Sequence, residues 1–412
     1  MKPWFQYSAF HWKRPHAIVI GAGIAGCQIS WHLCQTGWQV TLLEKEKHIS
    51  RQASGNLAGV ISPKMTAQKS PGEQFYQQAF EYTTSQLQHL IKQGATIDWY
   101  PCGMLQLAHN TRELQRWESL KQRQLSAEFI QLVSAHHASK IAGLTCDYPA
   151  SYFPQAGYIN PASFAHALIQ HKHCQLIPNT DVQALQRQGA QWQAMDIQGN
   201  ILAGAEVVII SNGKDLNLLS HSQMLPVAGV LGQTTLASTT TSHAPSCVIG
   251  HEGYLTPSYQ DVHVFGATFD RQFETVMLNT ESDQRNIQQL KQYLPTYAKS
   301  LEGLKSGHAA VRATTPDRYP YAGAIPDTQY FKHSYNALKH GNPKQAYPDA
   351  QYQQGLFVLG GFGSRGLTTS GLCAQLLSQL INGQIVSKEQ QVLLETLHPA
   401  RFLIRQLKRG QA

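Results

Sequence analysis

The stretch His16-Ala-Ile-Val-Ile-Gly21-Ala-Gly23-Ile-Ala-Gly26 decides the fold of this protein. Its first five residues form an apolar, β-branched run, which is typical of a buried parallel strand. The glycines follow at once with the spacing GxGxxG, and a helical pattern then extends to about Gln35. A second strand is predicted over residues 38–43, directly before Glu44. Together these elements predict a βαβ unit of about 30 residues.

The residue types in this unit favour a dinucleotide ligand. Gly21 allows the tight turn, Gly23 lets the backbone approach a pyrophosphate, and Gly26 lets the helix pack on the strand. The N-terminus of the helix, from Ile24 onward, offers N–H groups and a partial positive charge to phosphates. Glu44 stands 18 residues after Gly26, near the spacing of about 20 that is typical of the acid that binds a ribose diol. An ordinary glycine-rich turn is the alternative, and this context disfavours it.

The composition excludes several classes of protein. The chain has 412 residues, of which 42% are hydrophobic and 14% are charged, so it can form a full core and is not disordered. Glycine and proline are scattered, which excludes collagen-like and low-complexity sequences. No apolar run is long enough to span a membrane. Seven cysteines without a CxxC spacing favour free thiols in a reducing compartment, so we expect a cytoplasmic protein. The net charge of +8 is compatible with a polyanionic partner.

Strands from distant parts of the chain can complete one sheet. Residues 207–210 form an apolar run that ends near Gly213, and residues 356–359 form another that enters a glycine-rich segment and a long helix. We therefore predict an α/β protein, with a Rossmann-type nucleotide-binding domain interleaved with an α+β substrate domain. Residues 327–354 show no clear periodicity and are predicted to form a long loop. The expected division is a linker-like segment at 1–15, a nucleotide-binding domain at 16–60, 151–220 and 351–412, and a substrate domain at 61–150 and 221–350.

Two further glycine-rich segments favour FAD over NAD. Residues 51–59 are small, polar and flexible, as a loop against an isoalloxazine ring must be, and residues 360–366 open a second helix. A positive helix end near the flavin N1/O2 edge stabilises the reduced ring. Each segment alone is compatible with a plain loop, but together with the first motif they indicate a flavin. The expected cofactor-binding residues are Gly21, Gly23, Ile24, Gly26, Glu44, Ala53, Ser54, Gly55, Asn56, Val182, Gly213, Gly363, Ser364, Arg365, Gly366 and Leu367.

These segments together resemble the glycine oxidase/D-amino-acid oxidase (DAO) superfamily of flavoenzymes. Within it, the sequence is most similar to the FAD-dependent half of the MnmC family of bifunctional tRNA-modifying enzymes. The matches extend from about residue 16 to residue 409 and include Gly253-Tyr254-Leu-Thr-Pro257, Val311-Arg312-Ala-Thr-Thr-Pro and His398-Pro-Ala-Arg401. Lys2-Pro3-Trp4-Phe5 resembles the linker between the two halves of that family. The methyltransferase half is missing, so we expect no methylation by this chain and leave open a separate methyltransferase partner.

The resemblance implies oxidation of an amine. In that family, the FAD-dependent half removes the carboxymethyl group from 5-carboxymethylaminomethyl-(2-thio)uridine at the tRNA wobble position, which gives 5-aminomethyl-(2-thio)uridine and glyoxylate. The expected catalytic residues are then Arg312 and Arg365, which would hold the substrate carboxylate, and Tyr254 in the pocket. A guanidinium group pairs bidentately with a carboxylate. A structural ion pair of Arg312 with Asp317 and a place for Tyr254 in the core are the alternatives.

Two other functions and the RNA-binding surface stay open. The chain could oxidise free glycine, sarcosine or D-amino acids, or it could be a non-catalytic FAD-binding module of a modification complex. Basic and aromatic residues at 332–344 and a basic tail at 401–409 are the expected tRNA contacts. The His171-Lys-His173-Cys174 segment lacks a second pair of ligands, so we predict a surface turn and no metal site.

Overall fold

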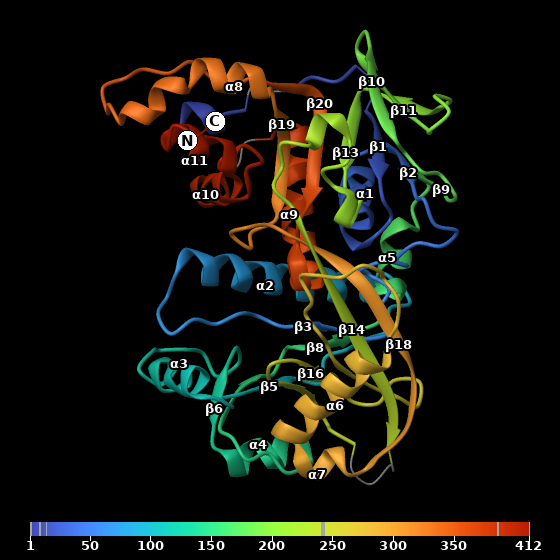
Figure 1. Ribbon diagram of the computed structural model, residues 1–412, viewed down its shortest axis with the longest axis vertical. Helices are drawn as coiled ribbons and strands as arrows, with labels where there is room; N and C mark the ends of the chain where they lie inside the picture. The colour runs from blue at the N-terminus through green and yellow to red at the C-terminus, as the bar shows by residue number, and fades with distance from the viewer. Residues whose placement is uncertain (1, 8–9, 14, 240–243, 385–386, 412) are drawn as a thin grey trace.

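The protein is described from a computed structural model, which defines residues 2–7, 10–13, 15–239, 244–384 and 387–411. Two β-sheets with their helices are stacked along the long axis of the molecule (Figure 1). Within the described residues, none of the helices is sufficiently long and apolar to cross a membrane.

The upper part of the molecule is built on a six-stranded sheet with the order β19-β20-β13-β1-β2-β9 (Figure 1). Neighbouring strands from β20 to β9 are parallel, and β19 pairs with β20 in the antiparallel direction. The strands are β1 (His16–Ile20), β2 (Gln39–Leu43), β9 (Cys174–Ile177), β13 (Val207–Ile210), β19 (Tyr321–Pro326) and β20 (Tyr352–Gly360). The predicted joining of distant apolar strands in one sheet is confirmed.

Successive side chains of β1 point to opposite faces of this sheet. Ala17 and Val19 lie in the core with α1 (Ile24–Gln35), α5 (Pro161–Ile169) and α9 (Gly366–Ile381). Ile18 and Ile20 lie in a second core, beneath the small sheet of β10 (Ala184–Gln188), β11 (Gln191–Met195) and β12 (Ile201–Ala205). A strand that is buried on both faces needs the continuous apolar run that the sequence has at this point.

The lower part contains an eight-stranded, mostly antiparallel sheet with the order β18-β14-β17-β16-β15-β5-β7-β6. Its long pair is β14 (Ala228–Thr239) and β18 (Leu301–Thr314), and the shorter strands are β5 (Met104–Leu107), β6 (Gln131–Val133), β7 (Ala150–Phe153), β15 (Val248–Gly250), β16 (Tyr254–Leu255) and β17 (His263–Gly266). The helices of this part are α2 (Pro71–Lys92), α3 (Thr111–Lys121), α4 (Ala135–Ala142), α6 (Thr280–Tyr293) and α7 (Pro295–Ala298). The strands β3 (Gly59–Ile61), β4 (Trp99–Tyr100) and β8 (Gly157–Ile159) form a small third sheet.

The prediction of a long loop over residues 327–354 is wrong. Asp327 accepts a hydrogen bond from the Tyr330 backbone N–H at 3.0 Å and caps α8 (Thr328–Ser334), which is followed by a 3₁₀-helix, η5 (Asn336–His340). Phe331 and Tyr335 are fully buried and pack against α11 (Arg401–Lys408). The two residues are four positions apart, which is the spacing of side chains on one face of a helix. Most of the residues around them are polar, so the sequence shows no continuous helical pattern of apolar residues.

The expected domain boundaries differ from the structure at two places. Strand β19 lies within the segment 221–350 that we assigned to the substrate domain, yet it belongs to the six-stranded sheet. The segment 1–15 was expected to be linker-like, but its Trp4 is buried in a hydrophobic core with residues of α8 and α11. Helix α10 (Lys388–Leu397) lies on the same side of the molecule as these helices (Figure 1). We call α8, η5, α10, α11 and residues 2–7 the cap. Residues 8–9 and 14 are outside the described residues.

Candidate active site

A cavity of about 780 Å³ lies where the two large sheets meet. The carboxyl ends of β1, β2 and β13 open into it from one side, and β14, β16 and β18 from the other. All the site residues that we predicted from the sequence line this cavity except Gly26 and Gly55. The tertiary structure therefore brings the three glycine-rich segments and both arginines to one place.

The first glycine-rich turn has the geometry that a bound pyrophosphate requires. Gly21 has a φ of +96°, and a Cβ atom there would lie 2.9 Å from Cα of Asn212. A Cβ atom on Gly26 would overlap the backbone of Gly21, so this glycine lets α1 approach β1 closely. The Oγ atom of Ser54 accepts a hydrogen bond from the Ile24 N–H at 3.1 Å. The loop 51–56 thus closes over the N-terminus of α1.

The carboxylate of Glu44 is fixed at the end of β2. It is 7% exposed and accepts hydrogen bonds from the N–H of Ala22 at 2.6 Å and of Glu46 at 3.0 Å. Nearby, the Oδ1 atom of Asn212 is buried and has no hydrogen-bond partner among the described residues. The adenosine diphosphate half of FAD fits this end of the cavity, which offers the carboxylate of Glu44, the open turn at Gly21 and the unsatisfied Oδ1 atom of Asn212.

Asn56 connects the predicted flavin loop to the lower sheet. Its Nδ2 atom donates hydrogen bonds to the Tyr254 hydroxyl at 2.6 Å and the Ala58 carbonyl at 2.7 Å, and its Oδ1 atom accepts one from Thr234 at 3.1 Å. Tyr254 lines the cavity, is partly exposed and packs against the main hydrophobic core. Burial raises the pKa of the Tyr254 phenol, which therefore stays protonated.

Arg312 carries an unneutralised positive charge at the cavity wall. It lies on β18 opposite Val230, and its guanidinium group lies over Gly232, where a Cβ atom would be 2.6 Å from Cζ. The group has no hydrogen bond or ion pair within the described part of the chain. Burial lowers its pKa, and Tyr254 raises it. Such a buried guanidinium is complementary to an anion.

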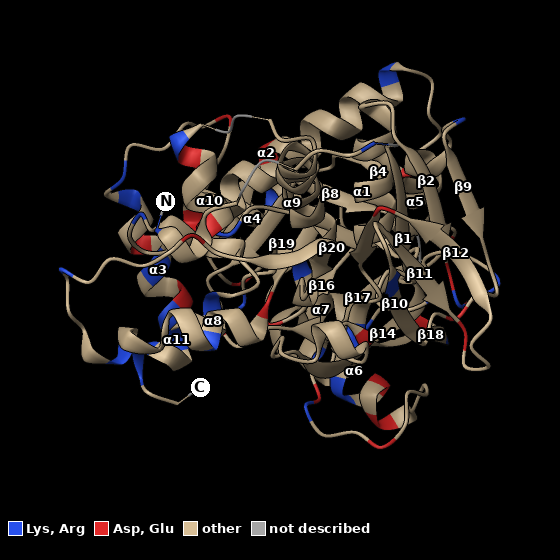
Figure 2. Cartoon of the chain, turned by 90° about the horizontal axis from the view of Figure 1, so that it is seen from above, with Lys and Arg blue, Asp and Glu red and all other residues tan. Residues whose placement is uncertain are grey.

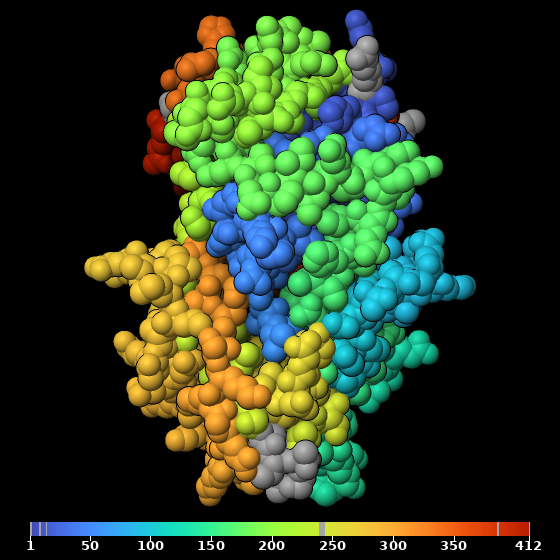
Figure 3. Space-filling view, turned by 90° about the vertical axis from the view of Figure 1, so that its right-hand side faces the viewer, coloured from blue at the N-terminus to red at the C-terminus, as the bar shows by residue number. Residues whose placement is uncertain are grey.

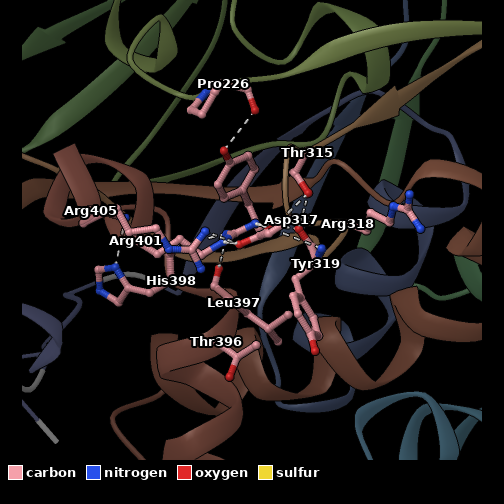
Figure 4. A network of polar contacts seen from close by, with 12 residues as sticks. Pro226, Thr315, Asp317, Arg318, Tyr319, Thr396, Leu397, His398, Arg401 and Arg405 are labelled. Carbon is pink, nitrogen blue, oxygen red and sulfur yellow. Dashed lines mark hydrogen bonds and ion pairs between the residues drawn. The ribbon is translucent and has the colours of Figure 1, made fainter. Parts of the chain in front are cut away.

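The alternative partner of Arg312, Asp317, is engaged elsewhere. Its carboxylate accepts two hydrogen bonds from Arg401, both at 3.0 Å, and forms an ion pair with Arg405 at 2.8 Å (Figure 4). Arg401 is only 3% exposed. The expectation that Arg401 contacts tRNA phosphates is therefore wrong, because the cap buries this side chain against the turn at Asp317. Other Lys and Arg residues of α8 and α11 are exposed, and Figure 2 marks their positions in blue.

Arg365 reaches the cavity from the N-terminus of α9. Its Nη1 atom approaches the Ser62 carbonyl at 3.5 Å, and Cζ lies 5.5 Å from the ring centre of Tyr76 on α2. Burial lowers the pKa of Arg365, Tyr76 raises it, and the Arg116 charge lowers it. No acidic side chain pairs with Arg365 in the described structure. A second cation is thus available beside the flavin-type loops.

Several residues of the site carry no signal in the sequence. Gly232, Thr234 and Ser62 contact the predicted residues only because β14 and β3 reach the cavity. His308 on β18 is a further case, since its Nε2 atom lies 2.8 Å from the Gln52 carbonyl and fixes the loop from outside. A smaller cavity of about 460 Å³ lies between this histidine and residues 48–57, on the face shown in Figure 3, where that segment is blue.

Comparison with known proteins settles the family. Residues 16–380 match the FAD dependent oxidoreductase (DAO) family. The chain belongs to this family. The predicted fold, the FAD cofactor and the class of oxidoreductase are thereby confirmed. The roles of the individual site residues stay predictions. Within the described residues, no group of three or more His, Cys, Asp or Glu side chains could hold a metal ion.

The similar curated proteins of this family are tRNA-modifying enzymes. The chain is 34% identical to the tRNA 5-methylaminomethyl-2-thiouridine biosynthesis bifunctional protein MnmC of Pseudomonas fluorescens, over 100% of this chain and 62% of that protein. It is 33% identical to the MnmC protein of Legionella pneumophila, over 96% of this chain and 58% of that protein. The chain therefore spans less than two thirds of the length of these relatives.

Two of the solved structures of similar fold are oxidases. Glycine oxidase from Geobacillus kaustophilus superposes with a TM-score of 0.75 at 19% identity, over 93% of this chain and 98% of that one. Iminodiacetate oxidase from Chelativorans sp. BNC1 superposes with a TM-score of 0.70 at 20% identity, over the same shares. At these identities the similarity concerns the fold.

Proposed function

We propose that this FAD-dependent enzyme oxidises the carboxymethylaminomethyl group of a wobble uridine in tRNA, which leaves an aminomethyl group and releases glyoxylate. The observation that carries the proposal is the unpaired guanidinium group of Arg312, which meets the cavity built by the flavin-binding motifs. The relatives named for 5-methylaminomethyl-2-thiouridine biosynthesis support this choice of substrate. We place the reaction in the cytoplasm.

The residues of the cavity divide between cofactor and substrate. Glu44 and the turn at Gly21 and Gly23 would hold the adenosine diphosphate part of FAD, and the loop 51–56 with the N-terminus of α9 would hold the flavin. When bound, FAD supplies the acceptor for a hydride from the substrate carbon. Arg312 and Arg365 would pair with the substrate carboxylate, which places the methylene group for the reaction.

The chemistry balances without an acid–base side chain. The substrate group –CH2–NH–CH2–COO⁻ loses a hydride from the carboxymethyl carbon and a proton from nitrogen, so that a C=N bond forms. Water then adds to this carbon and the C–N bond breaks, which leaves the amine on the uridine and releases glyoxylate. The substrate amine must be neutral before the hydride leaves. The task of the protein is to orient the carboxylate and to exclude other poses.

Mass analysis of tRNA nucleosides after incubation with the FAD-loaded protein tests this function. We expect the carboxymethylaminomethyl nucleoside to be converted to the aminomethyl nucleoside with an equal amount of glyoxylate. Reduction of the flavin by free glycine at the rate seen with modified tRNA would indicate a free amino-acid oxidase instead. A loaded protein that oxidises neither substrate would be a non-catalytic FAD-binding module.

A further inference from the structure

Two cations, Lys64 and Arg365, lie over the ring of Tyr76, next to the Arg365 side of the cavity. The Nζ atom of Lys64 lies 5.0 Å from the ring centre, and Cζ of Arg365 lies 5.5 Å from it. The Tyr76 hydroxyl donates a hydrogen bond to the Arg318 backbone carbonyl at 3.2 Å. The charges of Arg112 and Arg116, on α3, act on Lys64 as well. We call Lys64, Arg112, Arg116, Arg318 and Arg365 the Tyr76 cluster.

The acidic side chains near this cluster leave most of its charge unneutralised. Glu113 pairs with Arg116. Glu73 is 2% exposed and is engaged by Arg123. Asp317 precedes Arg318 in the chain, but Arg401 and Arg405 occupy its carboxylate, and Figure 4 shows the Arg318 guanidinium group pointing away from that network.

Four of the five cations therefore have no ion pair within the described residues, namely Lys64, Arg112, Arg318 and Arg365. Burial lowers the pKa of Lys64 to about 8, with the charges of Arg365, Arg318, Arg116 and Arg112 acting in the same direction. Like charges that crowd one site are unfavourable unless an anion binds among them.

The cluster continues from the cavity to the surface. Ser62 lines the cavity and accepts from Arg365, and Lys64 follows two residues later. The loop between β3 and α2 is held by Arg123, which donates to the Thr66 carbonyl at 3.0 Å. Arg112 and Arg318 are exposed. When the reacting group of a substrate is bound at Arg365, the part of the substrate that stays outside the cavity therefore lies beside these cations.

We propose that the Tyr76 cluster binds the RNA phosphates next to the nucleotide that enters the cavity. This inference rests on the proposed function, because it places the rest of the same substrate. Guanidinium groups bind phosphate oxygens through paired N–H donors, and single-stranded RNA commonly combines phosphate contacts with stacking on aromatic rings. The cluster is closer to the reacting group than the cationic surface of the cap, because it shares Arg365 with the cavity.

Charge-removing variants on the holoenzyme test the assignment. The double variant Lys64→Gln/Arg318→Gln keeps Arg312 and Arg365, and the matched control is Lys332→Gln/Lys339→Gln on the cap. We expect the cluster variant to bind unmodified tRNA about 10- to 100-fold more weakly and to lose about two units of the slope of log affinity against log salt. The control variant should lose less affinity for tRNA than the cluster variant. Equal flavin absorbance and thermal midpoint verify the fold of both variants.

The substrate without phosphates separates this inference from the proposed function. With the free nucleoside 5-carboxymethylaminomethyluridine, kcat/KM of the cluster variant should equal that of the wild type, while kcat/KM with tRNA falls. Unchanged tRNA affinity of the cluster variant, or a loss in the cap variant alone, overturns the inference. If the wild type oxidises neither substrate, the proposed function fails, and the binding measurement still decides whether the cluster holds RNA.

Discussion

At the scale of single residues, the site depends on a guanidinium group that the protein itself does not neutralise. Arg312→Ala should lower kcat/KM for the carboxylate substrate by at least about 100-fold, because a bidentate charged contact is lost at the reacting centre. FAD should stay bound, since Arg312 lies on β18, outside the glycine-rich segments that are expected to bind the cofactor. Steady-state kinetics and flavin absorbance check this. Loss of flavin from the variant would mean that Arg312 supports the fold.

Gly232 positions Arg312 and should be sensitive to the smallest side chain. A Cβ atom at residue 232 would lie 2.6 Å from the Arg312 Cζ atom, so Gly232→Ala must displace the guanidinium group. We expect kcat/KM to fall by about 10- to 100-fold with FAD retained. The control is Gly204→Ala on β12, where the nearest atom to a Cβ is 3.7 Å away. Equal kinetics for the two variants would contradict a positioning role.

At the scale of elements, the end of β2 and the start of α1 act together on the cofactor. Glu44→Ala removes the acceptor of the Ala22 N–H and the group expected to bind the ribose diol. We expect about a 10-fold or greater rise in the dissociation constant of FAD, measured by flavin retention on gel filtration. The remaining holoenzyme should turn over at nearly the normal rate. A large loss of kcat in flavin-saturated protein would assign Glu44 to catalysis instead.

The ion pair of Asp317 with Arg401 links the cap to the turn between β18 and β19. Asp317→Asn should lower the free energy of unfolding by about 3 kcal/mol, because it leaves the buried Arg401 charge uncompensated. The matched control is Arg405→Gln, since Arg405 pairs with the same carboxylate but is 49% exposed. That change should cost less than about 1 kcal/mol. Urea denaturation measures the free energy of unfolding of both variants. An equal loss in the two variants would mean that the buried pair of Asp317 with Arg401 stabilises the fold no more than the exposed pair with Arg405.

At the scale of the whole molecule, buried histidines make stability depend on acid pH. Burial lowers the pKa of His32, His251 and His398 to about 3, and they lie in α1, in the turn between β15 and β16, and in the cap. The unfolded chain takes up protons below the ordinary value of about 6.5, whereas the folded chain does not. Stability is therefore complete above pH 6.5 and is lost as the pH falls toward 3, by up to about 1.4 kcal/mol per pH unit for each histidine.

Denaturation at pH 7 and pH 5 measures this loss. The urea midpoint should be clearly lower at pH 5, and His398→Gln should reduce the dependence on pH. His398 is a suitable choice because it is fully buried, and its Nε2 atom lies 3.0 Å from the Tyr352 hydroxyl. A midpoint that stays constant between pH 7 and pH 5 would show that these histidines remain accessible to protons.

The sequence by itself determined the nucleotide-binding unit and the family of the protein. The glycine spacing, the buried strand before it and Glu44 after it are local features, because a left-handed turn at Gly21 and a helix start need only neighbouring residues. Burial of an apolar strand on both faces likewise follows from its own residues. For this reason the sheet formed from β1, β13 and β20 was predictable before its strands were seen together.

Only the tertiary structure decided which charges are free. Arg401 and Arg318 are both basic residues near Asp317, yet one is buried by the cap and the other points to the surface. Gly232 matters because β14 brings it under Arg312, and Lys64 because α2 and α9 meet beside Tyr76. Electrostatic pairing and close contact depend on distances between segments that are far apart in the chain, and no local pattern of residues encodes those distances.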